Sequence, residues 1–95
     1  MINVYELVDT EQKRQIEKWG DQTHRSDLEW FAITSEEFGE AAKELNEFHF
    51  RGEREQELIT EAIQVMACLK SWLEARDRRQ YLLAEYGFDG REVLV

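Results

Sequence analysis

Proline is absent from this chain of 95 residues, and only five residues are glycine. Proline disrupts a helix interior more than any other residue, and glycine comes next. The good helix formers Glu, Gln, Leu, Ala, Lys and Arg are abundant. The chain is therefore expected to be all-α, and its length corresponds to a single domain over residues 1–95.

Capping residues and glycines divide the chain into helical segments. A first helix is expected to begin at Asp9-Thr10-Glu11 and to stop at Gly20, and Ser26 or Asp27 can cap a second. A turn at Gly52 should separate the second helix from a third. The expected helices run from about 9 to 19, from 27 to 48 or 49, and from 53 to 76 or beyond. A shorter fourth helix is expected over 79–86, ended by Gly87.

Apolar residues recur at three- and four-residue steps in both long helices, as in an amphipathic helix. Joined by a short turn, two such helices should pack antiparallel as a hairpin. The first helix would cover one side of the hairpin, and a second subunit the other, giving a multi-helix bundle in a dimer or tetramer. The stripes consist of Phe31, Thr34, Phe38, Ala41, Ala42 and Leu45, and of Leu58, Ala62, Val65, Met66, Leu69, Trp72 and Leu73.

The net charge of −9 and the scattered basic residues argue against a nucleic acid polymer as partner. A phosphorylated small molecule would need a cation between itself and so acidic a chain. A single cysteine, Cys68, excludes an intramolecular disulfide and fits a reducing compartment. With neither a signal peptide nor an apolar run of ~18 residues, the chain is expected to be cytoplasmic and not to span a membrane.

Glu36, Glu37 and Glu40 form an acidic run in the second helix, and Glu37 and Glu40 lie at the edge of its apolar stripe. Glu61 and Gln64 hold a similar place on the third helix and can face them across an antiparallel hairpin. Clustered carboxylate and amide oxygens suit Mg²⁺ or Mn²⁺. The competing interpretation is a solvated acidic face, which is the commoner outcome for glutamate runs.

Three segments resemble motifs of the MazG-like nucleotide pyrophosphohydrolases, small phage and bacterial members included. The segment Glu36-Glu37-Phe38-Gly39-Glu40 is similar to their E-E-x-G-E helix, and Glu61-Ala62-Ile63-Gln64 to their E-x-x-D motif. Upstream, Trp19-Gly20-Asp21-Gln22-Thr23-His24 resembles a W-G-x-Q-x-H stretch. The motifs come in the family's order, with similar spacing, and the resemblance spans roughly residues 15–74.

The resemblance implies an all-α homodimer or homotetramer that hydrolyses a nucleoside or deoxynucleoside triphosphate between its α and β phosphates. Carried over by position, Glu37, Glu40 and Glu61 would hold Mg²⁺, with Mn²⁺ as a substitute, and Glu36 would orient or deprotonate the attacking water. Gln64 departs from the family's aspartate. It can still coordinate through its amide oxygen, but it supplies no charge, which puts metal number and turnover in doubt.

Several other side chains have both a functional and a structural interpretation. Trp19, Gln22 and His24 could contact the nucleotide or could serve in packing and capping, whereas packing is favoured for Trp30. Lys43 either pairs with Glu40 or approaches a phosphate. Three classes of function remain open: a pyrophosphohydrolase, a nucleotide sensor in which Gln64 has abolished turnover, and a helical interaction protein.

Overall fold

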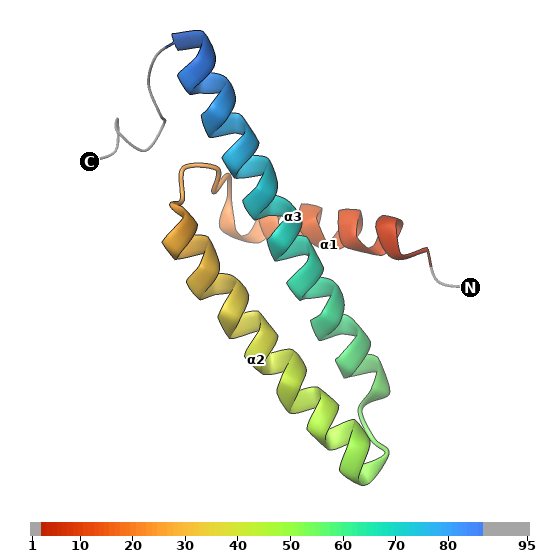
Figure 1. Ribbon diagram of the computed structural model, residues 1–95. Helices are drawn as coiled ribbons and strands as arrows, with labels where there is room; N and C mark the ends of the chain where they lie inside the picture. The colour runs from red at the N-terminus through yellow and green to blue at the C-terminus, as the bar shows by residue number, and fades with distance from the viewer. Residues whose placement is uncertain (1–2, 87–95) are drawn as a thin grey trace.

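The computed structural model describes the backbone of residues 3–86 and the side chains of residues 3–78. This part of the chain forms three helices and no strand: α1 (Val4–Trp19), α2 (Asp27–Arg51) and α3 (Glu55–Tyr86) (Figure 1). The all-α prediction is confirmed. Gly87 and the residues after it lie outside the described residues.

Helix α1 begins at Val4, five residues before the predicted start at Asp9. The side chain of Asn3 caps it by accepting the backbone N–H of Glu6 at 3.1 Å. Asparagine is a strong N-cap residue, so Asn3 is a capping signal in the sequence that lies upstream of Asp9. The helix ends as predicted at Gly20, whose φ of 80° suits glycine, and the Gly20 N–H donates to the Ile16 carbonyl.

Helix α2 has the predicted cap at Ser26 and the predicted turn at Gly52. Ser26 accepts the N–H of Glu29, and the Glu29 carboxylate accepts the N–H of Ser26, which is a capping box. At the other end Gly52 is left-handed, with φ 69°, and its N–H donates to the Phe48 carbonyl. The helix therefore continues to Arg51, slightly beyond the predicted end.

The predicted fourth helix over Arg79–Tyr86 is wrong as a separate element, because α3 continues without a break from Glu55 to Tyr86. This segment contains neither glycine nor proline, so nothing in it stops helix propagation.

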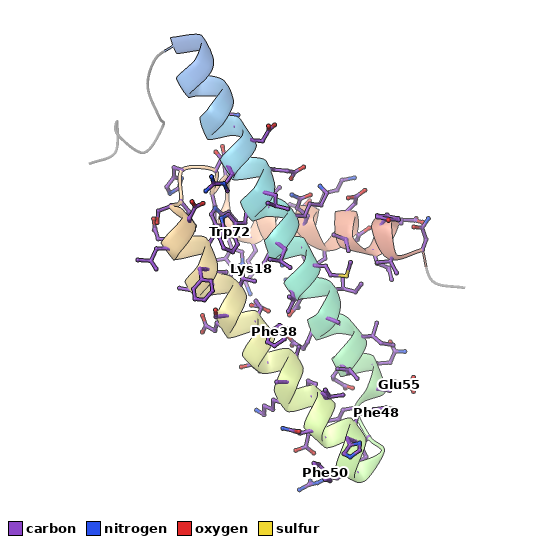
Figure 2. All side chains as sticks on the ribbon, viewed as in Figure 1. Lys18, Phe38, Phe48, Phe50, Glu55 and Trp72 are labelled. Atoms are coloured by element: carbon purple, nitrogen blue, oxygen red, sulfur yellow. The ribbon has the colours of Figure 1, made fainter. Side chains whose placement is uncertain are left out.

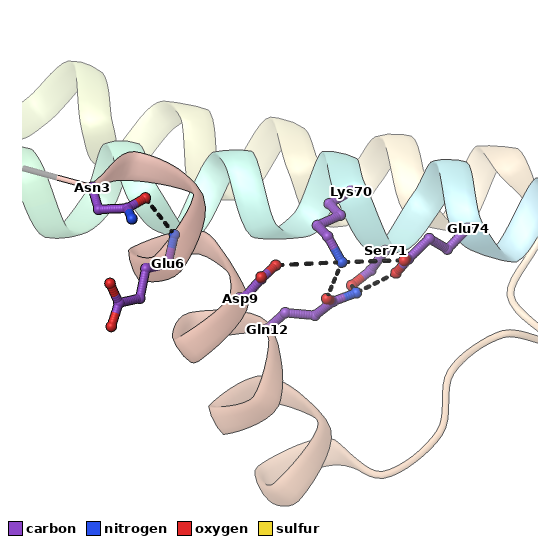
Figure 3. A network of polar contacts seen from close by, with 7 residues as sticks. All are labelled: Asn3, Glu6, Asp9, Gln12, Lys70, Ser71 and Glu74. Carbon is purple, nitrogen blue, oxygen red and sulfur yellow. Dashed lines mark hydrogen bonds and ion pairs between the residues drawn. The ribbon is translucent and has the colours of Figure 1, made fainter.

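Helices α2 and α3 form the predicted antiparallel hairpin, and α1 lies across α3 (Figure 1). Polar side chains fasten α1 to α3 (Figure 3). Gln12 donates to Ser71 at 3.0 Å and to Glu74 at 2.5 Å, and it accepts from Lys70 at 2.6 Å. No Cα atom of α1 comes within 8 Å of one in α2, so a space opens between these two helices.

The described side chains bury little apolar surface. The buried apolar residues are Val8, Trp30, Ala67, Cys68 and Ala75. The predicted stripe of α2 is largely uncovered in the single chain, with Phe31 58%, Phe38 65% and Leu45 52% exposed. Figure 2 labels Phe38 and Phe48 along α2. The hairpin was predicted correctly, but one chain alone does not cover its apolar face.

No helix in the described part of the chain is both long and apolar enough to cross a membrane.

Candidate functional site

A cavity of about 560 Å³ lies among α1, the connection after it, α2 and α3. Cavities of this size commonly hold small molecules. Its wall combines apolar side chains, among them Ile16, Trp19 and Trp30, with the acidic groups Glu36 and Glu37. The cavity exists because α1 crosses α3 and its backbone stays away from α2.

Glu37, Glu61 and Gln64 converge across the α2–α3 interface beside this cavity. With the Gln64 amide in the orientation that its neighbours require, Nε2 donates to Glu61 Oε2 at 2.8 Å and to Glu37 Oε2 at 3.0 Å. One amide nitrogen thus lies within hydrogen-bond distance of a carboxylate from each helix. The sequence predicted that acidic residues of the second helix would face Glu61 and Gln64 of the third, and this is observed for Glu37.

The ionised form of both carboxylates in this cluster is disfavoured by burial and by neighbouring negative charges. Burial, followed by the charge of Glu61, raises the pKa of Glu37 above its ordinary value. Burial, followed by the charge of Glu40, raises the pKa of Glu61. The amide of Gln64 bridges the two groups but carries no compensating charge. A cation at this place would relieve the repulsion.

The remaining predicted acids are only partly brought to the cluster. Glu36 lines the cavity, but its side chain is exposed; Glu40 is exposed and does not line it. Among the described residues no group of three or more His, Cys, Asp or Glu side chains could hold a metal ion. The structure therefore brings together two carboxylates and one amide of the four predicted ligands. The fourth, the exposed Glu40, acts on Glu61 through its charge but does not line the cavity.

Sequence reasoning missed Glu11 and Arg14 of α1. Arg14 lines the cavity, and its Nε and Nη2 donate to the two oxygens of Glu11 at 2.8 and 2.7 Å. The Glu11 side chain is only 12% exposed, and its charge contributes to the raised pKa of both Glu37 and Glu61. No motif marks these residues; only the crossing of α1 over α3 brings them to the site.

The predicted substrate contacts divide into two groups. Trp19 and Gln22 line the cavity. Trp19 is 61% exposed, and Gln22 helps to shape the connection by accepting from Arg25 Nε at 2.8 Å. His24 and Lys43 are exposed and do not line the cavity. The structure of the single chain therefore gives no support to the predicted contact of His24 and Lys43 with a substrate.

Cys68 lies in the cavity wall, and its thiol is expected to have low reactivity. Burial raises the pKa of its thiol to about 11, so it is protonated near neutral pH. The buried Cys68 side chain fills space in the wall and, as a thiol, is a weak nucleophile.

Comparison with protein-family models, with curated proteins and with solved structures finds no match for this chain. The resemblance to MazG-like enzymes therefore stays a prediction from the motifs.

Proposed function

We propose that this chain is a divalent-metal-dependent nucleotide pyrophosphohydrolase. The observation that carries the proposal is the convergence of Glu37 and Glu61 on Gln64 beside a cavity that could admit a nucleotide. Two repelling carboxylates from different helices suit a cation such as Mg²⁺ better than they suit the empty protein. The segments that resemble MazG-like motifs contain these same three residues.

In the proposed reaction, water attacks the α-phosphorus of a nucleoside triphosphate, and the bond from that phosphorus to the bridging oxygen breaks. The products are a nucleoside monophosphate and pyrophosphate. Glu37 and Glu61 would hold Mg²⁺ or Mn²⁺, with Glu40 joining from the next turn of α2. The Gln64 amide, whose nitrogen faces both carboxylates in this structure, would turn over to offer its oxygen. A metal bound by these residues would supply positive charge to neutralise the phosphates. Glu36, in the cavity wall, accepts the proton of the attacking water.

The test is product analysis with a panel of canonical and damaged nucleoside triphosphates in Mg²⁺ or Mn²⁺. We expect monophosphate and pyrophosphate in equal amounts from at least one nucleotide. Glu37→Gln should lower the rate at least 100-fold, because it removes a metal-binding charge. Glu17→Gln is the matched control, since Glu17 is an exposed α1 glutamate outside the cavity, and its activity should equal that of the wild type.

Release of inorganic phosphate in place of pyrophosphate would contradict the proposed bond cleavage. Equal activity in the Glu37→Gln and wild-type proteins would remove the acidic cluster from the reaction.

A second candidate is nucleotide binding without turnover, as in a sensor. The bridging amide favours it, because Gln64 holds Glu37 and Glu61 together without any cation. The distinguishing variant is Gln64→Asp, which restores the carboxylate of the E-x-x-D pattern. A wild-type protein that binds nucleotide without product, together with a Gln64→Asp protein that forms pyrophosphate, would establish the sensor.

We also propose that two copies of the chain associate through the exposed apolar stripe of the hairpin. Along this stripe Phe31 is 58%, Phe38 65% and Leu45 52% exposed. Large apolar side chains that gather on one exposed face mark surfaces that associate. A second copy would also bring further side chains toward Glu40 and Lys43, which the single chain leaves exposed.

A further inference from the structure

The indole N–H of Trp30 is a buried donor with no acceptor among the described residues. Trp30 is only 5% exposed. Buried polar groups in proteins nearly always have a partner, so an orphan needs an explanation. The other buried orphan, the hydroxyl of Thr34, needs none, because it can rotate toward a carbonyl of its own helix. An indole N–H is fixed in the ring plane and has no such choice.

Trp30 also forms part of the cavity wall, which includes the apolar side chains of Ile16 and Ile33. Glu37 lies on the same wall, seven residues further along α2, about 10 Å away at 1.5 Å per residue. A small group could not touch both residues. A ligand that does so is elongated, with a flat, largely apolar head that carries an acceptor and with an anionic tail that meets the metal-binding end. A nucleotide has this form.

We propose that Trp30 reads the nucleobase of the substrate, a role that rests on the proposed function for the phosphate end. The indole N–H donates to a carbonyl oxygen or ring nitrogen on the edge of the base. Because Nε1 is covered in the free protein, the ring turns toward the ligand as the base seats against it. The packing role predicted for Trp30 then describes the free protein only.

The first test follows the indole N–H resonances in a proton–nitrogen NMR spectrum. The protein has three tryptophans, and the Trp30 signal is identified as the one that Trp30→Phe removes, or by through-bond assignment if that variant does not fold. Nucleoside monophosphates are added with Mg²⁺, so that no turnover is needed. We expect the Trp30 proton to move downfield. Trp72, whose N–H already donates to Asp27 at 2.8 Å, serves as internal control and should not move.

The second test measures affinity. Trp30→Phe keeps an aromatic ring but loses the donor, so it should weaken monophosphate binding about 5- to 10-fold, the worth of one hydrogen bond. Ribose 5-phosphate, which has no base, should bind the wild type and Trp30→Phe equally. The matched control is Trp72→Phe, which should bind monophosphates as the wild type does.

Monophosphate binding that leaves the Trp30 resonance unmoved would overturn the inference, as would equal affinity in Trp30→Phe, or a Trp30 signal that no nucleotide moves. These outcomes are separable from failure of the proposed reaction. Hydrolysis with an unmoved Trp30 signal retains the reaction and rejects the base contact, whereas a shifted signal without hydrolysis retains the contact and rejects the reaction.

Discussion

Glu37 illustrates how one residue can oppose the stability of the fold that holds it. Burial and the neighbouring carboxylates raise its pKa, so the folded state favours the protonated form. Protonated Glu37 contributes stability that is fully present below the pKa of the group in the unfolded chain. This contribution is lost as pH rises through the higher pKa of the group in the folded protein. Near neutral pH the ionised cluster therefore costs stability unless a cation binds. Such a cost is expected at a binding site.

Glu37→Gln should accordingly stabilise the protein in EDTA at pH 7. The neutral amide removes the repulsion with Glu61, and we expect an increase in Tm of roughly 2–4 °C, the change that about half a kcal/mol gives in a domain of this size. Below about pH 4, where both proteins carry a neutral group at this position, the difference should disappear. Thermal melts across this pH range check the prediction; a Tm below that of the wild type at pH 7 would contradict it.

At the scale of the elements, the α2–α3 turn contains an ion pair that no sequence motif predicts. Arg54, just before α3, has a positive φ of 66° and donates from Nε and Nη2 to the buried carboxylate of Glu44 at 2.6 and 2.8 Å. The Arg54 guanidinium holds the pKa of Glu44 below its usual range. The paired charge compensates for backbone strain that a non-glycine residue meets at this φ.

Arg54→Ala should destabilise the hairpin, because it leaves Glu44 buried without a partner. Since the pKa of Glu44 is lowered in the folded state, the stability from this pair is present above the unfolded pKa and is lost as pH falls through the folded pKa. The Tm deficit should therefore be large at pH 7 and shrink toward pH 3. Arg51→Ala is the control, because it removes only the exposed pair with Glu47 and should change Tm little.

Arg54→Gly, which relieves the positive φ, should lose less stability than Arg54→Ala. Equal melting temperatures for Arg54→Ala and Arg51→Ala would show that the Glu44 pair does not hold the turn.

How far the sequence predicts the structure differs from element to element. Ser26, Gly20 and Gly52 predicted three helix ends, because capping and left-handed turns depend on local chemistry. The cavity was not predictable, since it depends on where α1 crosses α3. The acidic strips of α2 and α3 could be matched from helical periodicity, which places Glu37, Glu61 and Gln64 together. Glu11 and Arg14 reach the same site from a helix whose direction the sequence does not encode locally.

At the scale of the whole molecule, the main feature of the described residues is an uncovered apolar face. Its apolar stripe on α2 is exposed, and few of its described side chains are buried. Large exposed apolar patches mark surfaces that associate. A chain of this length has a small core, so we propose that a second copy adds stability by covering the stripe.

We expect sedimentation to find a dimer or tetramer at micromolar concentration. Phe38→Asp places a charge in the exposed apolar stripe and should shift the protein to monomer, with loss of activity if the site needs both copies. Tyr5→Asp is the matched control, because Tyr5 is 83% exposed on α1 and does not belong to the α2 stripe, so the substitution should leave the assembly unchanged. A wild-type protein that sediments only as monomer would contradict the proposed association.

The most direct measurement is a Mn²⁺ titration followed by NMR, because the paramagnetic ion broadens the signals of nuclei close to it. If Glu37, Glu61 and Gln64 form the metal centre, the side-chain amide of Gln64 should broaden first, and Glu37→Gln should require much more Mn²⁺ for the same effect. Early broadening centred on another acidic region, such as Glu53–Glu57, or spread evenly over the chain, would show that the cluster is not a metal site.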